Sequence, residues 1–172
     1  EGQWVRPWDD VVGVAVDDLF VFYSPRSARQ ELAFADFQSG KDVSQRRLML
    51  PCPFPVNAEV LKVLEEVIPL LHKLGVSIEA VGPGRYLLRA LPTVLGEVDG
   101  LVFAQNTLAL LHPVPESTSL RTELVKAWVT LMGVTPEPLK LNELQELMRI
   151  DAELMEIAQD LKILPYTLDF ST

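Results

Sequence analysis

Apolar positions at the start of the chain follow the two-residue period of β-strands. β-branched and aromatic runs cover residues 11–16 and 19–23, and Asp17-Asp18 stand between them. Two acidic residues between such runs are acceptable chemistry for a tight turn. We therefore predict a β-hairpin.

A helix is predicted directly after this hairpin. Ser24 can accept a hydrogen bond from the free amides of a helix start, and Pro25 suits the first helical position. Ala28, Leu32 and Ala35 then recur on one face. A strand-to-helix corner is where many folds place catalytic or metal-binding groups, so its side chains are candidates for chemistry.

The middle of the chain predicts an edge element, a long helix and a second hairpin. Three prolines in residues 46–55 leave either an edge strand or an extended connector. Asn57 predicts the cap of a helix with apolar residues at helical spacing, and Gly75 predicts its left-handed end. Residues 76–81 and 85–91 alternate as strands around a glycine-rich turn.

The last third is predicted to be helical. Residues 92–111 are mostly apolar, 112–119 form a loop at a possible subdomain boundary, and the helix from Leu120 is predicted to close at Gly133. Asn142 predicts the cap of a final helical region. Because the strands come in hairpins and do not alternate regularly with helices, the pattern favours an α+β fold.

Composition narrows the classes of function. The chain has 172 residues, 48% of them hydrophobic, enough for one domain or two small lobes. A net charge of −9 disfavours direct DNA binding, and a single cysteine excludes an internal disulfide and fits a reducing compartment. With no signal pattern and no apolar run near the roughly 20 residues of a membrane span, we expect a soluble, cytoplasmic protein. It begins without methionine, so we expect a fragment of a longer chain.

Candidate catalytic and metal-binding residues are isolated in the sequence. His72, His112 and Cys52 share no ligand spacing, which leaves no site for a metal cofactor. Ser24 lacks a nucleophile-elbow pattern and is explained as a helix cap. Gly82-Pro83-Gly84 lacks the Lys-Ser/Thr of a phosphate loop, so a turn is favoured. The acidic helical stretches are interpreted as solvated faces.

Two apolar regions allow either of two interpretations. Trp4, Trp8 and Phe22 accompany the first hairpin, and the last helical region is rich in Leu and Met. Such surfaces are either ordinary core or faces that a second copy covers.

The chain resembles the C-terminal dimerisation domain of MutL, a DNA mismatch repair protein family. "RRLMLPCPFPVNAEVLKVLEEVIPLLHKLGVSIEAVGPGRYLLRALPTVLGEVD", residues 46–99, is similar to the family's "LLxP" strand, long helix and following strands. "LKLNELQELMR", residues 139–149, is similar to the family's "LSLEEMQALLR" region. Residues 19–35 occupy the place of a family strand and helix. The resemblance spans nearly the whole chain, and its middle is the specific part.

Family members with nuclease activity carry D-Q-H-A-x-x-E-x-x-x-x-E at the corner that follows the hairpin, and this chain does not. The matching positions are Ser24, Pro25, Arg26, Ser27, Gln30 and Ala35. The A-C-R and C-P-H-G-R-P elements are likewise replaced, by Ala127-Trp128-Val129-Thr130 and by Leu164-Pro165-Tyr166-Thr167-Leu168-Asp169. Because metal chemistry needs convergent ligands, the resemblance implies a nuclease-free branch, with no catalytic residues, no metal and no cofactor. The family's ATPase activity would lie in a separate N-terminal domain.

A second family feature is a sliding-clamp-binding motif, Q-x-L-(L/I)-x-P. Leu48-Met49-Leu50-Pro51 matches its apolar half, while Arg46 stands at the glutamine position and Gln45 is one place early. The resemblance implies clamp binding by Gln45, Leu48, Met49, Leu50 and Pro51. A plain edge strand is the open alternative.

The resemblance implies a two-lobed, non-catalytic homodimerisation domain with hairpin strands packed on helices. Residues 1–45 plus 119–172 would form the dimerising lobe, and residues 46–118 an inserted outer, regulatory lobe. Two ATPase arms would be held together around DNA, in the bacterial cytoplasm at the nucleoid. Expected partners are a MutS-like protein, a nicking endonuclease, a helicase and the sliding clamp, with weak or no direct DNA binding and no membrane. The predicted dimer interface comprises Val14, Val16, Leu19, Phe20, Phe22, Leu154, Ile157 and Leu161.

Two other functions remain open from the sequence. One is a metal-dependent mismatch repair endonuclease whose ligands are displaced. The other is a monomeric adaptor that binds a sliding clamp.

Overall fold

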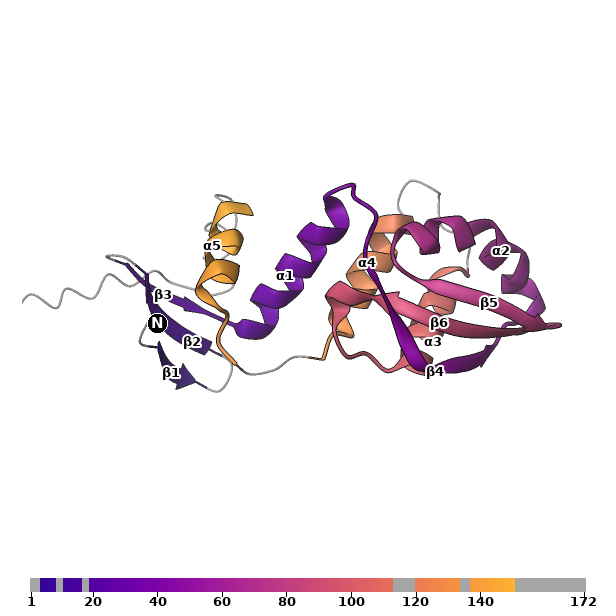
Figure 1. The fold of residues 1–172 in the computed structure, drawn as a ribbon, viewed down its shortest axis with the longest axis horizontal. Coiled ribbons are helices and arrows are strands. Elements are labelled where there is room, and N and C mark those ends of the chain that lie inside the picture. Colours follow the sequence, from indigo (N-terminus) through magenta and orange to yellow (C-terminus); the bar gives the residue numbers. More distant parts are fainter. Residues whose placement is uncertain (1–3, 9–10, 17–18, 113–119, 134–136, 151–172) are drawn as a thin grey trace, which may run out of the picture. The chain divides into compact units, whose positions relative to one another are not determined.

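The computed structural model describes five stretches of the chain, residues 4–8, 11–16, 19–112, 120–133 and 137–150 (Figure 1). These stretches contain two three-stranded antiparallel sheets and five α-helices, which confirms the α+β class. The chain divides into two compact units. Unit 1 comprises residues 1–32 and 134–172, and unit 2 comprises residues 33–133. The lobe boundaries implied by the family resemblance, at residues 45 and 119, stay a prediction.

The sheet of unit 1 contains the predicted hairpin and one further strand. Its order is β1 (Trp4–Trp8), β2 (Val11–Val16) and β3 (Leu19–Tyr23). The β2–β3 register, from Val12 opposite Tyr23 to Val16 opposite Leu19, confirms the hairpin. The hairpin prediction did not include β1, which carries Pro7 and pairs with β2 through an irregular register. A strand with an irregular register shows a less regular alternation of apolar and polar residues in the sequence, and this alternation is the signal from which strands are predicted.

Two helices belong wholly or partly to unit 1. They are α1 (Pro25–Gln38) and α5 (Leu141–Ile150). The Ser24 cap is confirmed, since Ser24 Oγ accepts from the backbone N–H of Ser27 at 3.3 Å. The buried cluster of unit 1 joins strands and helices: Val12, Tyr23, Ala28, Leu139 and Leu144. Tyr23 links the two chain segments of unit 1, because the Tyr23 hydroxyl oxygen accepts a hydrogen bond from the backbone N–H of Leu139 at 2.8 Å.

The predicted cap of α5 is wrong by two residues. Asn142 lies inside the helix, and the residue that precedes the helix is Lys140. Lys140 O accepts from the N–H of Leu144 at 3.0 Å, and Glu143 Oε2 accepts from the N–H of Lys140 at 2.7 Å. The Glu143 carboxylate thus supplies the backward half of a capping box, so no Asn side chain is needed.

The sheet of unit 2 has the order β4-β6-β5. Its strands are β4 (Gln45–Pro55), β5 (Ser77–Gly82) and β6 (Arg85–Pro92). The second hairpin is thereby confirmed, and β4 takes the edge position, one of the two alternatives predicted for it. An edge strand tolerates prolines because one side of it makes no ladder hydrogen bonds.

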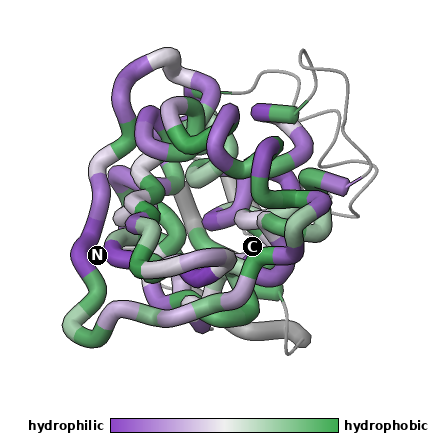
Figure 2. Tube along the Cα trace, turned by 90° about the vertical axis from the view of Figure 1, so that its right-hand side faces the viewer, coloured by the Kyte–Doolittle hydropathy of each residue, from purple (hydrophilic) through white to green (hydrophobic). Residues whose placement is uncertain are grey.

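The helices of unit 2 bury the apolar face of this sheet. They are α2 (Ala58–Lys73), a 3-10 turn at Thr93–Leu95, α3 (Gly100–Leu110) and α4 (Leu120–Thr130). Leu64 of α2, Phe103 of α3 and the sheet residues Phe54 and Leu88 line one small internal cavity and belong to one buried cluster. Figure 2 colours the described residues by hydropathy and shows short hydrophobic stretches interspersed with hydrophilic ones along the chain. Leu88 is buried on the face that the helices cover. The neighbouring Leu87 lies on the opposite face of the sheet, and its partner on β5 is the exposed Glu79.

Trp128 of α4 lies at the centre of the unit 2 core and is fully buried. Its Nε1–H donates to Thr107 Oγ1 of α3 at 2.9 Å, and that hydroxyl donates to Phe103 O at 2.8 Å. The Trp128 ring packs on Phe103 and Phe37, with centroids 4.9 Å and 6.0 Å away. One hydrogen bond and two aromatic contacts therefore join α1, α3 and α4.

The two glycines predicted to end helices, Gly75 and Gly133, differ in backbone conformation. Gly75 has φ +84°, the left-handed conformation predicted for it, and its N–H donates to His72 O at 3.0 Å. The prediction for Gly133 is wrong, because α4 ends at Thr130 and Gly133 lacks a positive φ. Its N–H donates to Glu97 O at 3.1 Å, and a Cβ there would lie 2.7 Å from that oxygen. Close backbone approach is what requires glycine at this position.

Candidate docking site

A large bulge interrupts β4 where it pairs with β6. Arg47 pairs with Ala90 and Cys52 with Leu88, so five steps along β4 match two steps along β6. Three extra residues are therefore accommodated between Arg47 and Cys52. Bulges of this kind aim side chains away from the ladder and are common beside binding sites.

The bulge presents large apolar side chains to solvent. Met49 is 99% exposed and Leu50 84% exposed, the two highest values among the large apolar side chains that the structure describes. An apolar group held out in this way loses hydrophobic stabilisation, and such groups often mark interaction sites. The bulge is therefore the strongest docking candidate in unit 2.

A groove of about 490 Å³ lies beside the bulge on the sheet. Its lining combines apolar residues of β4 with polar residues of all three strands: Gln45, Arg47, Leu48, Met49, Pro51, Ser77, Glu79, Arg89 and Ala90. Five of these nine residues are polar and four are apolar, so the groove offers charged groups and hydrogen-bonding groups next to an apolar surface.

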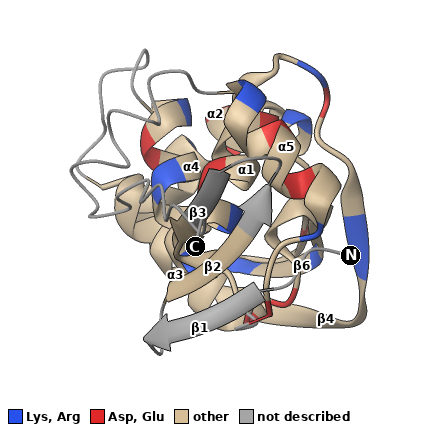
Figure 3. Ribbon diagram, turned by 90° about the vertical axis from the view of Figure 1, so that its left-hand side faces the viewer, with Lys and Arg blue, Asp and Glu red and all other residues tan. Residues whose placement is uncertain are grey.

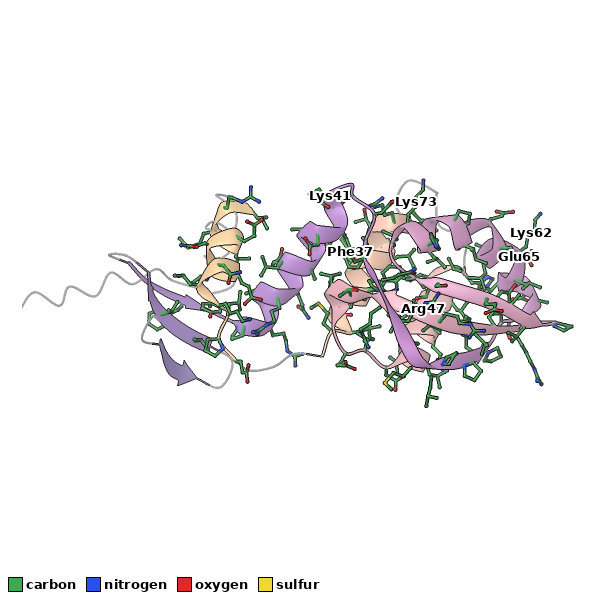
Figure 4. All side chains as sticks on the ribbon, in the orientation of Figure 1. Phe37, Lys41, Arg47, Lys62, Glu65 and Lys73 are labelled. Atoms are coloured by element: carbon green, nitrogen blue, oxygen red, sulfur yellow. The ribbon has the colours of Figure 1, made fainter. Side chains whose placement is uncertain are left out.

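The two neighbouring arginines of β4 do different things. The Arg46 side chain donates to Gly96 O at 2.9 Å and lies 3.7 Å from the Glu97 carboxylate. The Arg47 side chain lines the groove. Figure 3 marks the basic and acidic residues in the part of the chain that the structure describes. In Figure 4, Arg47 lies over the strands of the sheet, whereas Lys62 and Lys73 come from α2. Arg46 is therefore occupied in holding the 96–97 turn, and Arg47 is available to a partner.

An ion pair forms part of the groove floor. Arg89 Nε donates to Glu79 Oε2 at 2.5 Å, across the β5–β6 pair. The side chains are 44% and 52% exposed, so solvent screening leaves this pair a small contribution to stability. Its effect is local, since it neutralises one cation and one anion of the groove.

The five residues predicted to bind the clamp come together in space. Gln45, Leu48, Met49 and Pro51 line the groove, and Leu50 projects from the same bulge. Their binding role stays a prediction. Sequence reasoning missed the groove residues of the second hairpin, Ser77, Glu79 and Arg89. Alternation along that hairpin placed them on a polar face, and only the pairing of β4 with β6 brings them to the bulge.

The predicted interface residues of the first hairpin separate onto two faces of the sheet. Val14 follows Val12 by two positions and packs against the buried cluster of unit 1. Phe22 pairs with Gly13, so it lies on the opposite face and is half-buried. Val16 and Leu19 pair with each other, and Phe20 pairs with Ala15. The remaining three predicted residues, Leu154, Ile157 and Leu161, lie outside the described residues.

Helix α5 presents apolar side chains away from the unit 1 cluster. Leu144 is buried and Leu147 packs on the cluster, whereas Leu141 is 54% exposed, Met148 38% and Ile150 41%. A helix that is apolar beyond its buried stripe is typical of a surface covered by another chain.

The corner after the hairpin holds a helix cap. Ser24 Oγ accepts from Ser27 N, as described above, and the next side chains are a buried Pro25 and an exposed Arg26. In the part of the chain that the structure describes, no three His, Cys, Asp or Glu side chains gather where they could hold a metal ion.

Burial and the nearby negative charge of Asp99 raise the pKa of the Cys52 thiol, which favours its unreactive form. None of the described helices is both long and apolar enough to span a membrane.

Comparison with known proteins identifies the family of the chain. Residues 17–134, more than half of the chain, match the sequence model of the MutL C terminal dimerisation domain. A 55-residue stretch is 34% identical to the DNA mismatch repair protein MutL of Exiguobacterium sibiricum. This stretch covers 31% of the chain and 9% of that curated relative, so the chain matches a small part of the relative's length. By the match over residues 17–134, the chain belongs to the MutL C-terminal dimerisation domain family.

Proposed function

We propose that the chain is a non-catalytic homodimerisation domain of a MutL-like DNA mismatch repair protein. The observation that carries the proposal is the family match over residues 17–134. Two copies would hold two ATPase arms together around DNA by raising their effective concentration. Such a role needs a stable interface and no catalytic group.

The small apolar cluster of unit 1 supports dimerisation. In the described part of unit 1 this cluster joins five buried residues, and α5 leaves Leu141, Met148 and Ile150 exposed beside it. A twofold partner would cover these exposed apolar side chains. A stable obligate interface would bury upwards of about 2,000 Å² in total.

The first hairpin and the last helices are the proposed interface. Phe20→Asp would place a charge in the proposed apolar interface and is expected to lower the mass in solution to that of one chain, or to unfold unit 1. Met49→Asp is the matched control, because Met49 is 99% exposed on the bulge of unit 2. It is expected to keep the mass of the dimer. If Phe20→Asp keeps both mass and circular dichroism, the interface lies elsewhere.

The bulge of β4 is the proposed docking site for a sliding clamp. The exposed Met49 and Leu50 support the proposal, because they can enter an apolar pocket of a partner. Purified bacterial sliding clamp should bind the wild-type chain, and Met49→Asp should abolish binding. Contacts with a MutS-like protein, a nicking endonuclease and a helicase belong to the same proposed role.

Two measurements separate this proposal from its rivals. A monomeric adaptor would bind the clamp and sediment as a single chain. An endonuclease would bind zinc or manganese and nick supercoiled DNA. We expect a dimer that neither binds zinc or manganese nor nicks supercoiled DNA.

A further inference from the structure

Arg47 is the one cation of the groove without a partner among the residues that the structure describes. Arg89 is paired with Glu79, and Arg46 is held by Gly96 O and Glu97. The groove therefore contains two arginines against one carboxylate. Its local charge is positive, although the chain as a whole has a net charge of −9.

Apolar groups lie directly beside this cation. Arg47 precedes the bulge, and the groove that it lines is walled by Leu48, Met49 and Pro51. A partner that covers the groove must therefore offer apolar surface to the bulge and a negative group to Arg47. Nucleic acid does not match, because phosphate binding draws on several cations and gains nothing from an exposed methionine.

We propose that Arg47 is a specificity-determining residue of the docking site and pairs with a carboxylate beside the apolar pocket that receives Met49 and Leu50. The inference rests on the proposed docking role of the bulge. Met49 and Leu50 provide most of the affinity, because apolar groups at the centre of an interface dominate binding energy. Arg47 selects the partner, since a charged pair at the rim acts on association and on rejection of mismatched surfaces.

The test measures binding of purified bacterial sliding clamp to the full 172-residue chain at two salt concentrations. In 50 mM NaCl, Arg47→Ala is expected to raise Kd about two- to fivefold, as for a solvent-accessible ion pair. Arg47→Glu should raise it further, and Arg47→Lys should recover most of the affinity. In 500 mM NaCl the difference between the wild-type chain and Arg47→Ala should vanish, because the screening length falls to a few ångströms.

Arg85→Ala is the matched control. Arg85 is an exposed arginine of the same sheet that does not line the groove. This variant is expected to bind as the wild-type chain does at both salt concentrations. If Arg85→Ala lost as much affinity for the clamp as Arg47→Ala, the positive charge of the sheet as a whole would promote binding, and the assignment to Arg47 would be overturned.

The outcomes distinguish this inference from the docking role itself. If Met49→Asp abolishes binding while Arg47→Ala and Arg47→Glu bind as the wild-type chain does, the docking role stands and the inference is overturned. If the wild-type chain does not bind the clamp, or Met49→Asp binds normally, the docking role fails and the assignment of Arg47 fails with it.

Discussion

Replacing Thr107 with valine tests the core that supports the docking sheet. The two side chains have nearly the same shape, so the substitution creates little cavity. It removes the acceptor of the Trp128 Nε1–H, which lies 2.9 Å from Thr107 Oγ1 in a fully buried position. A buried donor left without an acceptor costs about 1–3 kcal/mol. We expect the free energy of unfolding of unit 2 to fall by that amount.

Tryptophan fluorescence during urea unfolding provides the measurement. The chain has three tryptophans, so a background with Trp4→Phe and Trp8→Phe leaves Trp128 as the sole reporter. With an m-value of about 1–3 kcal/mol per molar urea, the midpoint should drop by roughly 1 M while the slope stays constant. A variant that also carries Trp128→Phe contains no tryptophan, so its urea unfolding is followed by circular dichroism. Its loss of stability should be non-additive, since both partners of the bond are then gone.

Thr130→Val is the control for this series. Thr130 is exposed at the end of α4, and its hydroxyl donates to Ala127 O at 2.6 Å. We expect a change within about 0.5 kcal/mol, as for other surface substitutions. An equal effect of Thr107→Val and Thr130→Val would refute the reasoning, because burial of the donor would then not determine the cost.

Three further predictions concern backbone geometry and pH. Gly75→Ala should destabilise unit 2 by about 1–2 kcal/mol or more, since φ is +84° and backbone atoms lie 3.1–3.2 Å from the added Cβ; Gly40→Ala, with φ +74° and open space, should cost less in the same urea titration. Gly133→Ala should also destabilise unit 2 in that titration, since its Cβ would lie 2.7 Å from a backbone oxygen. Burial raises the pKa of Tyr23 above its ordinary 10.0, so the contribution of Tyr23 to the stability of unit 1 should be fully present below pH 10 and lost as the pH rises through the folded-state pKa. Urea midpoints from pH 8 to 11 should show this alkaline loss in the wild-type chain and a smaller one in Tyr23→Phe.

The sequence predicted those elements whose signals are local. The first hairpin, the Ser24 cap and the left-handed Gly75 follow from residues within one turn or strand of each other. The cap of α5 was misplaced because a carboxylate three residues into the helix replaced the side chain expected from Asn142.

The docking site depends on contacts that the sequence does not display. The sequence of residues 46–55 predicts only an edge strand or an extended connector, and the bulge appears only when β4 pairs with β6. That pairing brings Glu79 and Arg89 to the groove and directs Arg47 away from its neighbour Arg46. Gly133 was misinterpreted for the same reason, because its constraint comes from the distant backbone of Glu97.

The mass of the chain in solution tests the central claim most directly. Sedimentation equilibrium or light scattering at about 100 µM should report twice the 19.2 kDa of one chain, with the circular dichroism of a folded α+β protein. A folded species of 19.2 kDa at that concentration would contradict the proposed homodimer.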